Sequence, residues 1–206
     1  MLTEILVVLI LFGLAWYFLP NWSSTIIPDV SDGTVTVQKS QPSVTQFSYT
    51  CWLRIDHFGD YGKPKVIFVK GSPNLEHACP AVLLDGNTNT LLIKLDTFGD
   101  QETIPVTSVH SKKWLHFALT VQEHEMIVYI NGIEYVHQTL VNLPKTNNGN
   151  VVTSPDKGFS GRIAQLEMFP RVLTPDDIAS RARNPPSVSE AHQVFPPYLS
   201  MNWFKP

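Results

Sequence analysis

The chain has 206 residues, and 15 Lys and Arg face 18 Asp and Glu, so the formal net charge is −3 at pH 7. This length allows one domain with a sizeable core plus appendages. The basic side chains are scattered singly, so the chain lacks the basic field that attracts nucleic acid, and we expect no nucleic-acid partner.

Residues 1–20 are predicted to form an N-terminal transmembrane helix that anchors a single-pass membrane protein. Residues 5–19 read ILVVLILFGLAWYFL and carry no charge, and the apolar stretch is near the short end of the roughly 17 to 25 residues that a bilayer requires. A cleaved signal peptide fits less well, because Glu4 is the one charge before this stretch and no small-residue cleavage site follows it. A buried helix inside an assembly is the alternative. The side chains assigned to the anchor are Ile5, Leu9, Phe12, Trp16 and Tyr17. The sequence does not decide on which side of the membrane the domain lies. Positive charges beside an anchor indicate its orientation, and the first lysine after this anchor is Lys39.

Residues 21–33 are rich in Pro, Ser, Thr and Asp and are expected to form a tether. Apolar runs then predict strands, with a weaker one at 104–109 where Pro105 suits a sheet edge. The other predicted strands of this half are 34–38, 47–56, 65–70, 81–85 and 90–96. Cys51 shares its face with Tyr49 and Leu53, which predicts a buried free thiol. The sequence does not decide whether Cys51 and Cys79 form a disulfide.

The stretch 114–132, WLHFALTVQEHEMIVYING, predicts consecutive antiparallel strands. Two apolar runs, 114–121 and 126–130, flank a polar break, and the first alternates as a half-buried strand does. Asn131 and Gly132 predict a type I′ turn, which needs positive φ at both central residues. A third strand, 133–140, follows.

These residues also resemble a known family. The W-x-H-x-A-x-T strand followed by Y-I-N-G is similar to the laminin-G-like and pentraxin-like branch of the concanavalin A-type lectin/glucanase superfamily. The segments FSYTCWLR at 47–54 and VIFVKG at 66–71, and the region from 161–163 through 169–178, also match. The resemblance covers residues 34–183 and implies an all-β jelly-roll sandwich.

The C-terminal part is predicted to contain a polar loop, a short helix and an extended tail. The loop spans residues 141–158. Thr174 is placed as the N-cap of the helix, with Pro175 in its first turn. The tail, residues 184–206, is proline-rich and aromatic, and Tyr198, Trp203 and Phe204 are expected to dock on a partner.

No Glu-x-Asp-x-Glu strand of the glucanases is present, so we expect no enzymatic activity and no catalytic residues. Glu123 and Glu125 are interpreted as a solvated hairpin end, and His116 as a histidine satisfied within the sheet. Trp52 lies on the more polar face of its strand, where its ring could stack on a sugar. No structural zinc spacing occurs.

Two similar loops suggest calcium. Residues 54–60 and 94–100 share the pattern basic, aliphatic, Asp, any, Phe, Gly, Asp, and calcium takes six to eight oxygen ligands. The candidate ligands are Asp56, Asp60, Asp96, Asp100 and Glu102. Three strand reversals separate the loops, so they are expected at opposite rims. Turn formation explains the same residues, and we prefer it to a cofactor.

The leading hypothesis is a non-enzymatic, membrane-anchored structural or adhesive component of a larger assembly. Short-anchored sandwiches of this kind resemble virion proteins of large DNA viruses, so a virion is the suggested assembly. The expected partners are the membrane, other subunits of the assembly and glycans, in a virion or cell-surface membrane. The alternative hypothesis is a carbohydrate-binding lectin at a membrane surface, and the third hypothesis is a glycoside hydrolase.

Overall fold

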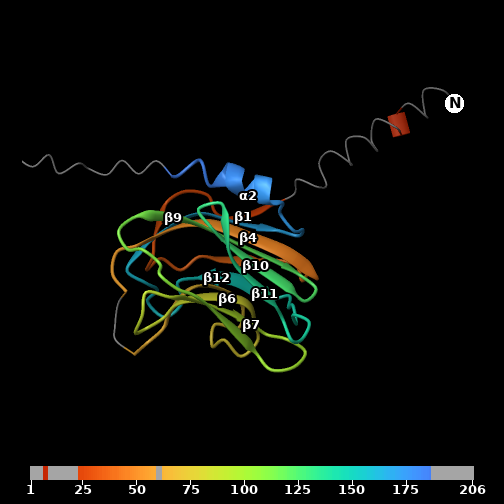
Figure 1. Cartoon of the computed structure of the whole chain (residues 1–206), viewed down its shortest axis with the longest axis horizontal. Helices are drawn as coiled ribbons and strands as arrows, with labels where there is room; N and C mark the ends of the chain where they lie inside the picture. Colours follow the sequence, from red (N-terminus) through yellow and green to blue (C-terminus); the bar gives the residue numbers. More distant parts are fainter. Residues whose placement is uncertain (1–6, 9–22, 59–61, 187–206) are drawn as a thin grey trace, which may run out of the picture.

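The computed structural model of the chain describes residues 7–8, 23–58 and 62–186, and within them two antiparallel sheets pack face to face (Figure 1). Sheet A contains, in spatial order, β1 (Ser24–Ile27), β13 (Gly161–Phe169), β4 (Gln46–Ile55), β9 (Trp114–Gln122), β10 (Glu125–Ile130) and β11 (Ile133–Thr139), with β2 (Ser31–Asp32) paired to β13. Sheet B contains β3 (Gln38–Ser40), β12 (Asn150–Thr153), β5 (Lys65–Gly71), β6 (Ala78–Leu84), β7 (Leu91–Leu95) and β8 (Glu102–Val106). The expected all-β sandwich is confirmed.

The core lies between the inner faces of the two sheets and follows from the alternation in the strands. From β4, Tyr49, Cys51 and Leu53 point inward, and Phe117 and Leu119 of β9 do the same. Cys51 and Cys79 are both buried and free, which confirms the expected thiol at Cys51.

The central hairpins also form as predicted. β9 and β10 pair from Gln122 opposite Glu125 to Phe117 opposite Ile130. Asn131 and Gly132 both have positive φ, 52° and 83°, as a type I′ turn requires. The dipeptide therefore fixes where β10 returns as β11.

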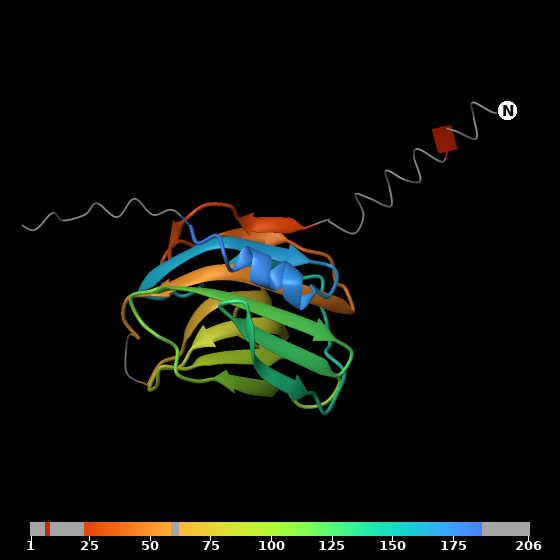
Figure 2. The same cartoon turned by 45° about the horizontal axis from the view of Figure 1, so that its top comes forward.

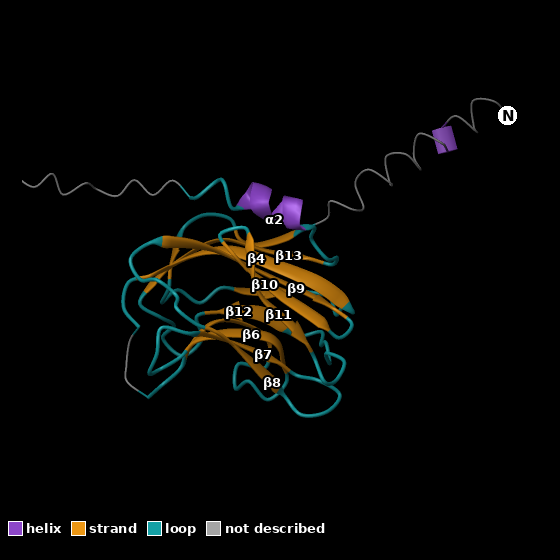
Figure 3. Cartoon of the chain, in the orientation of Figure 1, coloured by secondary structure: helices purple, strands orange, loops and turns teal. Residues whose placement is uncertain are grey.

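The outer face of sheet A is covered by helix α2 (Pro175–Arg181), drawn in purple in Figure 3. Thr174 caps the helix, because its hydroxyl accepts a hydrogen bond from the Asp177 backbone N–H and the Asp177 carboxylate accepts one from the Thr174 N–H. Ile178 and Leu173 pack on Tyr129 and Phe169 of the sheet in a second, smaller core. The predicted helix start is confirmed, and the helix buries a face that carries polar residues.

Three boundary predictions are wrong. Residues 24–27 lie inside the expected tether, yet they form β1, where Ile26 and Ile27 are buried against the sandwich. The β-branched run Thr25-Ile26-Ile27 outweighs the surrounding loop composition. The strand expected at 34–38 begins at Gln38, and the loop expected at 141–158 contains β12, which fills the position between β3 and β5.

Candidate functional site

Because successive strands alternate in direction, the connecting loops gather at two ends of the sandwich. Rim 1 holds the β4–β5, β6–β7, β8–β9, β10–β11 and β12–β13 connections, and rim 2 holds the β3–β4, β5–β6, β7–β8, β9–β10 and β11–β12 connections. Backbone hydrogen bonds join neighbours within each rim: the Asp56 N–H donates to Ser160 on rim 1, and the Asp96 N–H donates to Ala78 on rim 2. The candidate site lies on rim 1.

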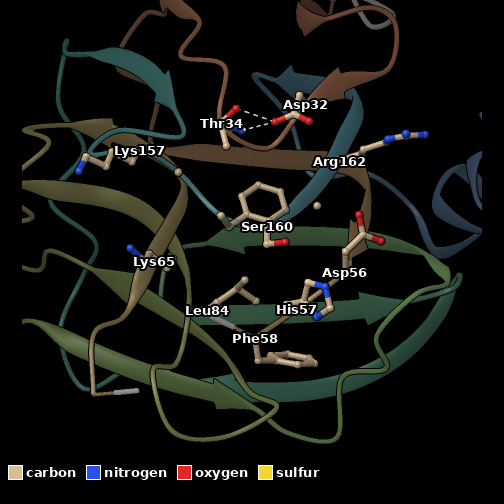
Figure 4. A pocket seen from close by; sticks show the side chains of 13 residues that line it. Asp32, Thr34, Asp56, His57, Phe58, Lys65, Leu84, Lys157, Ser160 and Arg162 are labelled. Carbon is tan, nitrogen blue, oxygen red and sulfur yellow. Dashed lines mark hydrogen bonds between the residues drawn. The ribbon is translucent and has the colours of Figure 1, made fainter. Parts of the chain in front are cut away.

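The rim-1 pocket has a volume of about 450 Å³ and lies where the β2 turn, the β4–β5 loop and the β12–β13 loop meet (Figure 4). Its lining includes Asp32, Thr34, Asp56, His57, Phe58, Lys65, Leu84, Lys157, Ser160 and Arg162. Cationic side chains, carboxylates, hydroxyls and an aromatic ring therefore surround one hollow, which is the composition of a site for a polar ligand.

Close backbone packing holds two of these loops together. The Gly33 N–H donates to the Gly161 carbonyl at 2.7 Å, and the Phe159 N–H donates to the Gly33 carbonyl at 3.0 Å. Gly158 has φ +60°, and a Cβ there would lie 2.0 Å from the Gly33 oxygen. A side chain at Gly158 would push the loops apart, so the glycine is required for the shape of the pocket.

The charges in the pocket are unevenly compensated. Asp32 accepts hydrogen bonds from the hydroxyl and the backbone N–H of Thr34, and these bonds, together with the charge of Arg162, hold the pKa of the Asp32 carboxyl below its ordinary value (Figure 4). Asp56 forms an ion pair with Arg54 at 3.0 Å. Lys157 and Arg162 also line the pocket and bring further positive charge to it. A ligand with acceptor oxygens fits this balance.

The calcium candidates do not come together among the described residues. Asp56 lies on rim 1, and Asp96, Asp100 and Glu102 belong to the β7–β8 connection at rim 2, so the two loops lie at opposite rims as expected. The Glu102 carboxylate accepts hydrogen bonds from the Val141 and Asn142 backbone N–H groups. No group of three His, Cys, Asp or Glu side chains placed for a metal occurs within residues 7–8, 23–58 and 62–186. Asp60 lies outside the described residues.

Sugar stacking on Trp52, which the sequence left as a possibility beside a place in the folded sandwich, is not available on this surface. Trp52 is 5% exposed, and its ring lies edge-on to the ring of His116 with the centroids 5.1 Å apart. Both lie beneath α2 and line a hollow of about 180 Å³ together with Glu167 and Arg181. The outer face of the sheet is polar, as the sequence indicates, but the helix covers it.

His116 also departs from its expected state. It is 1% exposed, and its Nδ1 atom has no hydrogen-bond partner among the described residues, so this nitrogen is not satisfied within the sheet. Burial, assisted by the charge of Arg181, lowers the pKa of His116 to about 4. The imidazole is therefore neutral near pH 7.

Most residues of the predicted anchor and tail lie outside the described residues. Ile5, Leu9, Phe12, Trp16 and Tyr17, and the docking residues Tyr198, Trp203 and Phe204, are not among the described residues. Within the described ranges no helix is long and apolar enough to cross a membrane.

Sequence reasoning missed most of the rim-1 pocket. Of its lining residues, Asp56 was singled out, and for a different ligand. Lys157 and Arg162 lie about a hundred residues further along the chain than Asp56, and the pairing of β13 with β4 brings them to the same rim. The available signal was the glycine set at 33, 158 and 161, which marks a close backbone approach but not its partners.

Two comparisons bear on the fold. The sequence profile of a family described as the concanavalin A-like lectin/glucanases superfamily matches residues 29–179. Among solved structures, the chain is similar to the binding domain of botulinum neurotoxin serotype G, with 15% identity, 78% of this chain and 46% of that chain covered, and a TM-score of 0.59.

Two further structures match to the same extent. The binding domain of Paraclostridial Mosquitocidal Protein 1 has 16% identity, 79% of this chain and 46% of that chain covered, and a TM-score of 0.59. Botulinum neurotoxin type C, which depends on interaction with two ganglioside molecules to enter cells, has 16% identity, the same coverage and a TM-score of 0.58. The chain thus spans less than half the length of these proteins, and the likeness concerns the fold.

Proposed function

Because the chain belongs to the concanavalin A-like lectin/glucanase superfamily, we propose that it is a non-catalytic adhesive domain that binds a glycan in the rim-1 pocket. In this proposal residues 1–20 hold the domain beside a membrane, as the apolar sequence 5–19 predicts.

The observation that carries the proposal is the composition of the pocket. Sugar hydroxyls need donors and acceptors that converge on one hollow, and a ring face gains stability from packing on an aromatic side chain. Lys157 and Ser160 of the β12–β13 loop and Arg162 of β13 supply polar groups to the lining, and Phe58 of the β4–β5 loop supplies a ring (Figure 4). Support from the comparisons is indirect, because the ganglioside contact is a property of the toxin.

The charge state of the pocket supports binding without catalysis. A glycoside hydrolase of the two-carboxylate type needs one carboxylic acid with a raised pKa that protonates the leaving oxygen. The pKa of Asp32 is shifted in the opposite direction, and Asp56 is held in an ion pair with Arg54. Neither carboxyl group is arranged as a general acid.

An adhesive domain can also be a component of a larger assembly, which is the role that the sequence suggests. The proline- and aromatic-rich tail, residues 184–206, is the segment that we propose to dock on a neighbouring subunit. A virion as that assembly rests on the sequence resemblance alone.

A glycan array with the full chain in detergent micelles tests the proposal. Neutral and acidic glycans form separate arms, because the cationic side chains of Lys157 and Arg162 favour a carboxylated or sulfated sugar. We expect saturable binding that weakens about tenfold in Lys157→Glu, since a charge-assisted hydrogen bond contributes about 1.5 kcal/mol or more. The control is Lys145→Glu, an exposed lysine on rim 2.

If no glycan on the array binds the chain, the proposal is wrong. Equal binding by both charge-reversal variants would place the glycan site away from rim 1. Newly formed reducing ends during incubation with a bound glycan would show that the domain cleaves its ligand.

A further inference from the structure

Rim 2 carries three large apolar side chains, on two adjoining loops, that no part of the described structure covers. Phe98 is 74% exposed, Val141 80% and Leu143 44%. Phe98 belongs to the β7–β8 connection and the other two to the β11–β12 connection. Single exposed apolar residues are common, but three on two adjoining loops form a patch that indicates a contact surface.

Backbone hydrogen bonds hold the two loops in one arrangement. The Phe98 N–H donates to the Leu143 carbonyl at 3.0 Å, and the Lys145 N–H donates to the Asp96 carbonyl at 2.8 Å. The Glu102 carboxylate accepts from the Val141 N–H at 2.9 Å. The apolar side chains are therefore presented by a pinned backbone, and their exposure is built into the loops.

The chain also enters the sandwich at this rim. Ser24, the first residue of β1, pairs with Met168 near the end of β13, which runs from rim 1 to rim 2. In Figures 1 and 2 β1 accordingly begins at the end of the sandwich opposite the β4–β5 loop. The five residue steps from Leu19 to Ser24 reach at most about 18 Å. An anchor at residues 5–19 would thus keep rim 2 close to the bilayer.

We propose that rim 2 lies on the membrane surface, with Phe98, Val141 and Leu143 inserted among the lipids at the interface. The proposal rests on the membrane anchor of the proposed function. β1 is at one edge of sheet A, and β11 and β8 end the two sheets at the other edge. The anchor and the apolar patch then attach the domain at two edges of one rim, so the domain cannot swing freely and rim 1 points away from the bilayer.

The charges near the patch select the lipid. Asp100 is exposed in the same loop as Phe98, and Glu123 lines the hollow that Phe98 and Leu143 share. Carboxylates are repelled by anionic headgroups, and Lys145, an exposed lysine of this rim, offsets the charge of one of the two. The membrane is therefore one with a zwitterionic surface, and phosphatidylcholine vesicles are the appropriate probe.

Site-specific labelling of the full chain in phosphatidylcholine vesicles tests the orientation. Val141→Cys carries a fluorophore on rim 2, and Ile133→Cys is the matched control, because Ile133 is 73% exposed and lies at the rim-1 hairpin. Native Cys51 and Cys79 are buried, and burial raises the pKa of both thiols, so the introduced cysteine takes the label. We expect a lipid-borne quencher near the headgroups to quench the label at 141 about fivefold more than the label at 133.

Each other outcome contradicts the proposal in a distinguishable way. A chain that floats with the vesicles but shows equal quenching at both positions keeps the anchor and loses the rim-2 contact. A label at 141 that is shielded from an aqueous quencher but not reached by the lipid quencher means that a protein partner or a second copy covers the patch. A chain that does not float with the vesicles lacks both the anchor and the lipid contact.

Discussion

The two faces of sheet A are built from the same strands and are both buried, but by different means. On the inner face, Tyr49 and Phe117 are 0% exposed within a continuous apolar core between the sheets. On the outer face, Ser48 is 0% exposed beneath the segment that leads into α2, and His116 is 1% exposed beneath α2. Burial of the inner face is favourable through its apolar side chains, although the Tyr49 hydroxyl finds no hydrogen-bond partner among the described residues. The outer face carries more polar groups, and its burial requires partners for them.

The outer face meets this requirement incompletely. The Ser48 hydroxyl donates to the Arg171 carbonyl at 2.8 Å and accepts from the Leu173 N–H at 2.9 Å. The Nδ1 atom of His116 has no such partner in the part of the chain that the structure describes. The inner face is therefore expected to provide most of the stability, and the outer face to respond to pH.

The largest expected effect is on the inner face. Phe117→Ala should lower the free energy of unfolding by about 4 kcal/mol, because a fully buried ring is lost and its neighbours cannot collapse into the space. Urea unfolding of the chain in micelles measures this value. Ile133→Ala, at an exposed position, should stay within about 0.5 kcal/mol of the unmodified protein. Similar effects of the two changes would contradict the assignment of the core.

His116 should make the outer face sensitive to acid. Its pKa is lowered to about 4 in the folded chain, so the unfolded chain, with an ordinary value near 6.5, binds more protons between these limits. The associated stability is fully present above about pH 6.5 and is lost as the pH falls toward 4, with a loss on the order of 3 kcal/mol. Unfolding curves for the unmodified chain and for His116→Gln across this range isolate the effect, and parallel curves would exclude it.

Sequence reasoning reached the inner face and stopped at the outer one for a physical reason. The alternation in 47–56 identifies which residues point into the sandwich, because period two follows from strand geometry. It cannot tell whether water or another segment meets the opposite residues. The sequence therefore did not predict that α2 covers Trp52 and His116, although it correctly predicted that this helix starts at Thr174.

The rim-1 pocket shows the same limit. The strands that end at this rim could be assigned from their apolar runs, and the turn residues between them from Gly and Asp. The meeting of Arg162 with Asp32 depends on β2 and β13 pairing across more than a hundred residues. Local patterns do not encode that pairing, so the sequence did not group Asp32 and Arg162 with Asp56.

The outer cover should be weaker than the inner core. Ile178→Ala should lower the free energy of unfolding by about 2 kcal/mol, at the low end for a buried aliphatic residue, because a peripheral helix can settle into the space. Amide hydrogen exchange should increase in α2 before it increases in β4 and β9. A loss as large as that of Phe117→Ala would mean that the two faces contribute equally.

The smallest expected effect concerns the helix cap that holds the cover in place. In Thr174→Ala the hydroxyl that accepts from the Asp177 N–H at 3.2 Å is removed, which should lower the free energy of unfolding by about 1 kcal/mol. Thr174→Ser retains the oxygen and should keep most of this stability. Because loosening α2 admits water to His116, the alanine variant should also raise the pKa of that ring toward its ordinary value, which proton NMR of the imidazole can follow. An unchanged imidazole titration in a destabilised Thr174→Ala variant would show that the helix is not what keeps His116 neutral.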